Sequence, residues 1–114
     1  MFARRVSLQL KPNSAVMLTE KMENEVLPLL RKQNGFQDEI TFLSQDGTKA
    51  FGISLWDKKE SAENYVRDTY PTVEKILAPM VEGSPQVGSY NVSNSTFHKV
   101  GAPATTPATV AVST

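Results

Sequence analysis

The sequence contains no cysteine, and its only histidine is His98. The lack of cysteine excludes disulfide bonds, thiolate nucleophiles, iron–sulfur clusters and thiolate-bound zinc. A single histidine also excludes a cluster of histidines around a metal ion, and a serine hydrolase triad would depend on this one late residue as its base. We therefore expect no bound metal, and we expect packing and subunit association to stabilise the protein.

The chain also lacks an excess of charge of either sign, with 12 basic and 12 acidic residues. Surfaces that neutralise phosphates usually need a cationic excess, so nucleic acid is not an expected partner. Glycine-rich phosphate loops are absent as well, and no nucleotide cofactor is implied. The start of the sequence has no apolar run typical of a signal peptide, and no window could span a bilayer, so we expect a cytoplasmic protein without membrane contact.

A length of 114 residues suits one domain, and 39% hydrophobic residues can form an ordinary core. We expect this domain to occupy residues 1–100. Residues 101–114 contain no charged side chain and consist of Ala, Thr, Pro, Val, Gly and Ser. Such low complexity is typical of a flexible tail.

Four segments have the pattern of strands. Apolar and polar residues alternate from Arg4 to Leu10. Residues 38–44 and 49–56 are rich in β-branched and aromatic side chains, and Asp46-Gly47 between them favours a tight hairpin. Residues 86–92 form the fourth predicted strand, with an extension through residues 95–97.

Two segments have helical periodicity. The first covers residues 14–33, where Pro28 should bend or break the helix because it lacks an N–H group. The second follows Asp57, which with Glu60 has the form of a capping pair. Pro71 should interrupt this helix, and a second piece should end before residues 83–85.

This order predicts an α+β protein with a ferredoxin-like β-α-β-β-α-β fold, in which both helices cover one face of an antiparallel sheet. We expect the helix-covered face to present Val6, Leu8, Leu10, Phe51, Ile53 and Leu55. The other face should present Ser7, Gln9, Ser54 and Trp56. A mixed polar and aromatic face is neither core nor ordinary surface, so we expect it to meet a second subunit.

Three segments carry a resemblance to a known family: VLPLLRKQNGFQDE, SLWDKKESAENYVRDTYPTV and PQVGSYNV. With the first strand, they make residues 2–100 resemble the antibiotic biosynthesis monooxygenase-like family of the dimeric α+β barrel superfamily. The resemblance implies a homodimer in which two sheets face each other and residues 93–100 reach the partner. It also implies a pocket between sheet and helices near Trp56.

The resemblance singles out candidate site residues. Trp56, Tyr65, Tyr70 and Arg67 are the candidates for catalysis, and Ser7, Gln9, Ser54 and Trp56 are the candidates for ligand binding. Each has a structural alternative, because large aromatic side chains fill small cores and an arginine on a charged helix is usually surface. The haem-degrading branch of the family is disfavoured, since the first strand has no asparagine and the second helix no histidine.

Two functions remain open at this point. The first is a cofactor-independent monooxygenase in which O2 reacts with an anthrone-like or quinol-like aromatic molecule. Such a substrate supplies its own electrons once deprotonated, so the protein needs a dry pocket and a base. The second is a non-catalytic dimeric barrel, associated with stress or with the binding of a small apolar or aromatic ligand.

Overall fold

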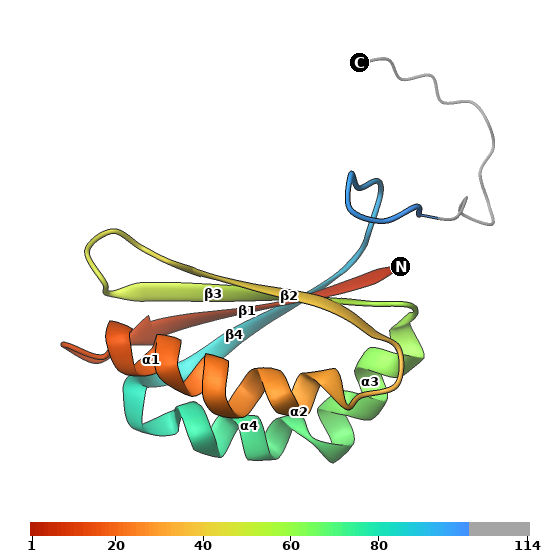
Figure 1. Cartoon of the computed structure of the whole chain (residues 1–114). Coiled ribbons are helices and arrows are strands. Elements are labelled where there is room, and N and C mark those ends of the chain that lie inside the picture. Colours follow the sequence, from red (N-terminus) through yellow and green to blue (C-terminus); the bar gives the residue numbers. More distant parts are fainter. Residues whose placement is uncertain (101–114) are drawn as a thin grey trace.

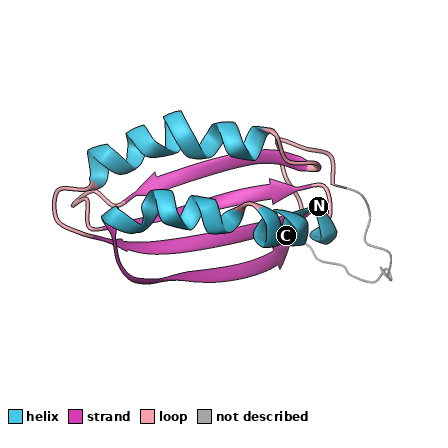
Figure 2. Cartoon of the chain, turned by 90° about the horizontal axis from the view of Figure 1, so that it is seen from below, coloured by secondary structure: helices cyan, strands magenta, loops and turns pink. Residues whose placement is uncertain are grey.

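A computed structural model describes residues 1–100 of the chain. It consists of a four-stranded antiparallel sheet with all of its helices on one face (Figure 1). The view from below shows two rows of helices running along the sheet (Figure 2). In chain order the elements are β1 (Phe2–Leu10), α1 (Ala15–Lys21), η1 (Met22–Val26), α2 (Leu27–Arg31), β2 (Phe36–Leu43), β3 (Lys49–Trp56), α3 (Lys59–Asp68), α4 (Tyr70–Leu77), η2 (Ala78–Met80) and β4 (Val81–Asn91).

The strand order is β2-β3-β1-β4, with every neighbouring pair antiparallel. This is the ferredoxin-like arrangement, so the predicted fold class is confirmed. None of the helices in residues 1–100 has the length and apolar character needed to cross a membrane. The predicted tail, residues 101–114, lies outside the described residues.

The assignment of residues to the two sheet faces was wrong for β3. Pairing partners share a face, and Val6 pairs with Gly52 while Ser7 pairs with Phe51. The helices therefore cover Val6 and Leu8 together with the small side chains of β3, and Phe51, Ile53 and Leu55 lie on the uncovered face. The residues that share a face within each strand were predicted correctly, but the apolar residues of β1 and those of β3 lie on opposite faces of the sheet.

The first helical segment contains the irregularity that Pro28 predicts. Residues 22–26 form a π-helical turn, and the N–H of Leu27 donates to the carbonyl of Met22, five residues earlier. Pro28 then occupies the first turn of α2. Residues in the first turn of a helix make no N–H hydrogen bond within it, so the lack of an N–H group in proline costs no helical bond there. A change of helical register thus accommodates the proline without ending the helix.

The second helical segment breaks at Thr69, and Pro71 lies in the first turn of α4, as its sequence indicates. The predicted cap at Asp57 was wrong, because Lys58 precedes the helix and makes no side-chain cap. The Asp57 carboxylate instead accepts a 2.6 Å hydrogen bond from the Ser61 hydroxyl, and the Asp57 N–H donates to the carbonyl of Gly35. These bonds join the start of α3 to the turn before β2.

The fourth strand is longer than predicted. It begins at Val81, so residues 83–85 lie within β4 and do not end a helix. They form an irregular stretch between the pairs Gln9–Glu82 and Ser7–Gln86, which lets Pro85 lie in a strand without disrupting the ladder. Residues 95–97 are not a strand. The chain there crosses toward β2, where His98 contacts the carboxylate of Asp38.

Two hydrophobic clusters join the helices to the sheet. The larger one surrounds Trp56, which is fully buried, and the smaller one surrounds Leu18 and Met80. Between the clusters, the sheet presents small or polar side chains at Gly52 and Ser54. This gap in the apolar packing is where the pocket described below lies.

The turn at Gly35 provides a test of the packing. Gly35 has φ +83°, and a Cβ atom there would lie 2.3 Å from both Asp57 Oδ1 and Ser61 Oγ. Gly83 has φ +69° with nothing within 4 Å of such an atom. We expect Gly83→Ala to lower the free energy of unfolding by about 1 kcal/mol, from backbone strain alone, and Gly35→Ala by about 3 kcal/mol, because a clash adds to that strain. Urea denaturation measures both, and equal losses would contradict the close packing at Gly35.

Candidate functional site

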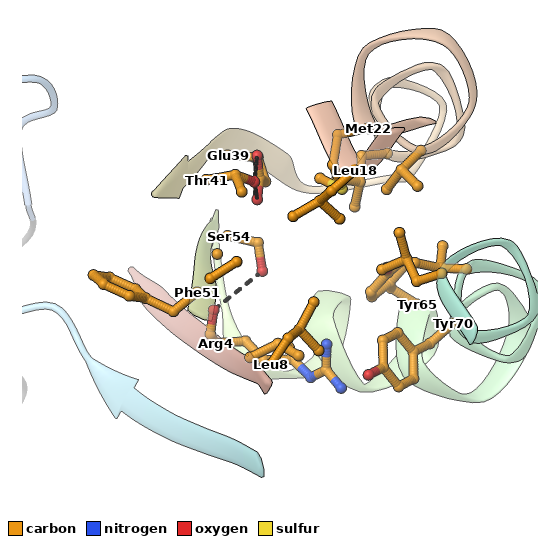
Figure 3. A pocket seen from close by; sticks show the side chains of 17 residues that line it. Arg4, Leu8, Leu18, Met22, Glu39, Thr41, Phe51, Ser54, Tyr65 and Tyr70 are labelled. Atoms are coloured by element: carbon orange, nitrogen blue, oxygen red, sulfur yellow. Dashed lines mark hydrogen bonds between the residues drawn. The ribbon is translucent and has the colours of Figure 1, made fainter. Parts of the chain in front are cut away.

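A pocket lies between the helix-covered face of the sheet and the helices (Figure 3). Its volume is about 60 Å³, room for about four water molecules, and it is partly open to solvent. Most of its lining is apolar, contributed by Val6, Leu8, Leu18, Met22, Val26, Leu30, Val73 and Leu77. The polar lining consists of Arg4, Glu39, Thr41, Ser54, Tyr65 and Tyr70. An apolar cavity with a few converging polar groups is the usual form of a small-molecule site.

The pairing of the strands aligns three of these polar residues in one row. Arg4 of β1 is opposite Ser54 of β3, which is opposite Glu39 of β2. Adjacent strands are about 4.8 Å apart, so the Cα atoms of Arg4 and Glu39 are separated by about 10 Å, with Ser54 between them. The row spans the floor of the pocket with a cation at one end and a carboxyl group at the other.

Glu39 occupies space that Gly52 leaves free. A Cβ atom on Gly52 would lie 2.6 Å from Glu39 Oε2. The Thr41 hydroxyl contacts both carboxyl oxygens, with its shorter hydrogen bond, 2.8 Å, to Oε2. Burial raises the pKa of Glu39 above its ordinary value, and the Thr41 hydrogen bond opposes this in part. A carboxyl group with a raised pKa in a pocket is a candidate proton acceptor and donor.

Arg4 is buried, with 6% of its surface exposed. Its guanidinium carbon lies 4.1 Å from the centroid of the Tyr70 ring and 6.0 Å from that of Tyr65. Within residues 1–100 no carboxylate forms an ion pair with Arg4, and no hydrogen bond from its guanidinium is found. The tyrosine rings are therefore its main source of stabilisation, through cation–π attraction.

Trp56, predicted to border the cavity, lies behind its wall. Its ring packs against Tyr65 and Phe36, with centroid distances of 5.1 and 5.5 Å. Its Nε1 donates a 2.9 Å hydrogen bond to Ser54 Oγ, and that hydroxyl lies 3.5 Å from the Arg4 carbonyl. Trp56 thus fills the core and orients Ser54, which does line the pocket.

Both predicted tyrosines line the pocket. Burial raises the pKa of the Tyr65 hydroxyl, while the positive charge of Arg4 acts in the opposite direction. Tyr65 therefore stays protonated at neutral pH and can donate a hydrogen bond but not act as a base. Tyr70 is half-buried and faces Arg4 (Figure 3).

The other predicted site residues are not brought to this pocket. Ser7 and Gln9 lie on the opposite face of the sheet, where they line a separate shallow depression with Arg5. Arg67 is exposed on α3, and its guanidinium pairs with Asp68. Among the described residues, no three His, Asp or Glu side chains are placed to hold a metal ion.

Sequence reasoning missed Arg4, Glu39 and Gly52. The signal for Arg4 was present, because it has the same parity as Val6 and Leu8 and therefore shares the helix-covered face. Glu39 had no such signal. Its neighbours Ile40 and Phe42 are the apolar set of β2, yet the pairing places them on the uncovered face.

Comparisons with known proteins identify the fold and leave the activity open. No protein-family model and no curated protein matches the sequence. A protein of unknown function from Nitrosomonas europaea, NE2512, is similar with a TM-score of 0.70 and 14% identity, over 90% of this chain and 95% of that one. The monooxygenase ActVA-Orf6 of Streptomyces coelicolor, solved with nanaomycin D, has a TM-score of 0.70 and 20% identity, over 82% and 88%. SnoaB, a cofactor-independent oxygenase from Streptomyces nogalater, has a TM-score of 0.68 and 10% identity, over 83% and 95%.

The raised pKa of Glu39 predicts a pH-dependent stability. A carboxyl group whose pKa is higher in the folded than in the unfolded state favours folding below its unfolded value, and loses this contribution as pH rises through the folded value. Glu39→Gln should therefore become more stable relative to the wild type as pH rises from about 4. Urea denaturation at a series of pH values measures this trend. Glu20→Gln, on the exposed side of α1, controls for the lost charge, and the same trend in both variants would refute the assignment.

Proposed function

We propose that this protein binds a small aromatic molecule in the pocket and oxidises it with O2 as a cofactor-independent monooxygenase. The observation that supports the proposal best is the placement of Glu39 in the same mostly apolar cavity as Arg4 and Tyr70. The shared fold with ActVA-Orf6 and SnoaB agrees with it. Anthrone-like and quinol-like molecules are the substrate class that we infer.

The chemistry requires a proton acceptor and exclusion of bulk water. In its ionised form Glu39 would take a proton from an acidic C–H or O–H group of the substrate. The resulting anion supplies the electrons that reduce O2. For an anthrone, one oxygen atom becomes the new carbonyl, and the other leaves as water with the two hydrogens of the original CH2 group. The apolar lining would keep the reacting anion away from solvent.

Oxygen uptake with a panel of anthrones and quinols tests this function. Glu39→Gln should lower the turnover number by a factor of about 10² or more, because an amide cannot accept the proton. Glu20→Gln on the exposed side of α1 should leave turnover unchanged. Equal oxygen uptake by Glu39→Gln and the wild type would show that Glu39 is not the base.

The alternative is a binding protein without catalysis. It is favoured by the placement of two residues first expected to be catalytic, since Trp56 is fully buried and Arg67 is exposed and paired with Asp68. Tight binding of aromatic ligands without oxygen uptake would select this alternative.

We also propose that the protein is a homodimer formed by its uncovered sheet face. That face carries several apolar side chains that no helix covers: Ile40, Phe42, Phe51, Ile53, Leu55 and Tyr90. Phe42 and Phe51 stack on each other, and Phe42 is 43% exposed. An apolar patch of this extent usually marks an interface between proteins.

Placing a charge in this face tests the dimer. Phe42→Lys should convert a dimer into a monomer, because a buried unpaired ammonium group opposes association. Val16→Lys, on an exposed position of α1, should remain dimeric. Analytical ultracentrifugation distinguishes the two states, and far-ultraviolet circular dichroism confirms folding. A monomeric wild type would refute the proposal.

A further inference from the structure

The guanidinium of Arg4 is a charge without a counter-ion in the described part of the chain. Burying a charge is costly unless an opposite charge or several hydrogen bonds compensate it. Only 6% of the surface of Arg4 is exposed, and its closest stabilising neighbour is the ring of Tyr70. A cation–π contact compensates the lost hydration of a guanidinium only in part. The guanidinium thus keeps slight contact with solvent and lacks an anionic partner.

Glu39 does not supply the missing charge. It lies in the same row as Arg4 but two strands away, and the two do not form an ion pair. The carboxyl group is held by Thr41 in the space above Gly52, and burial favours its neutral form. The pocket therefore has an unmatched positive charge at one end and a carboxyl group suited to hold a proton at the other.

We propose that Arg4 is the counter-ion of the ligand, and that the pocket takes a hydroxylated aromatic ring bound as its phenolate. This inference deepens the proposed function, because it rests on the pocket being a site for aromatic ligands. Binding moves one proton: the O–H bond of the phenol breaks, the proton passes to the ionised carboxylate of Glu39, and the phenolate oxygen pairs with the guanidinium of Arg4. No oxidant is needed for this step.

The charge of the pocket favours a phenol over other acids. Arg4 is the only Lys or Arg side chain that lines this cavity in residues 1–100. A phosphate with two negative charges would leave one of them uncompensated in an apolar site. A carboxylate would leave Glu39 to take its proton from solvent, whereas a phenol brings both that proton and the negative charge that pairs with Arg4.

Access to Arg4 also suits an anion. Arg4 lines a second depression, a groove between β4 and α3 whose rim carries Lys59, Arg67 and one carboxylate, Glu63. Arg67 is partly neutralised by Asp68. The rim charges thus nearly balance, Arg4 supplies the net positive charge of the groove, and an ionised oxygen can approach its guanidinium there.

The probe 4-nitrophenol tests the proposal directly, because its ionised form absorbs visible light and its neutral form does not. At a pH where the free probe is mostly neutral, the wild type should bind it in the coloured, ionised form. Arg4→Met should weaken its binding at least about tenfold, because a buried anion would lose its partner. The methyl ether 4-nitroanisole cannot ionise, and its affinity should be nearly unchanged by the same substitution.

Two further variants complete the design. Arg5→Met removes the same charge one residue away, where the guanidinium lies over Phe51 on the opposite face of the sheet, and it should bind 4-nitrophenol like the wild type. Arg4→Lys keeps the charge and should bind the ionised probe with intermediate affinity. If Arg4→Met does not fold, the ionisation state of 4-nitrophenol bound to the wild type decides.

The outcomes separate this inference from the proposed oxygenase. Binding of neutral 4-nitrophenol by the wild type, or equal affinity of Arg4→Met and the wild type for 4-nitrophenol, would overturn the role of Arg4. Failure of the wild type to bind either probe would overturn both the inference and the aromatic ligand site. Ionised binding that depends on Arg4, without oxygen uptake from any anthrone or quinol, would support the inference and refute the oxygenase.

Discussion

The register between β1 and β3 is the constraint on which the rest of the structure depends. It places Arg4 opposite Ser54 and Val6 opposite Gly52, so the sheet under the helices is small or polar in its middle. A shift of one residue would turn the side chains of one strand to the other face. If that strand were β1, Arg4 would lie on the uncovered face, and if it were β3, Phe51 and Ile53 would fill the pocket. The same register produces the cavity on one face of the sheet and the apolar surface on the other.

Burying Arg4 and Glu39 costs free energy, and contacts within the protein compensate that cost only in part. The ring of Tyr70 lies against the guanidinium of Arg4, and the Thr41 hydroxyl holds the carboxyl group of Glu39. Arg4 and Glu39 do not form an ion pair with each other, because Ser54 lies between them. Replacing buried charged groups by well-packed apolar side chains often stabilises a protein. Groups that cost stability are typical of functional sites, where they are arranged for a ligand and not for the fold.

Local patterns in the sequence were sufficient for most of the secondary structure. Asp46-Gly47 closes the predicted hairpin, with Gly47 at φ +74°, and Pro28 and Pro71 mark the irregular points of the two helical segments. The errors have a common cause. Parity in a strand shows which residues share a face, but it does not show how that face aligns with the next strand. Ser54 was assigned to the uncovered face with Ser7 and Gln9, but the pairing turns it to the helix-covered face, where it lines the pocket with the two tyrosines.

The sequence by itself determined the order of strands and helices, the ferredoxin-like class and the lack of any cysteine chemistry, because these depend on local periodicity, turn residues and composition. Only the tertiary structure decided which face of each strand the helices cover. That choice makes Arg4 a buried cation, gives Glu39 its place above Gly52 and moves Trp56 from the cavity into the core. It depends on pairing between residues some 50 positions apart, as between Arg4 and Ser54, and no local pattern contains that pairing.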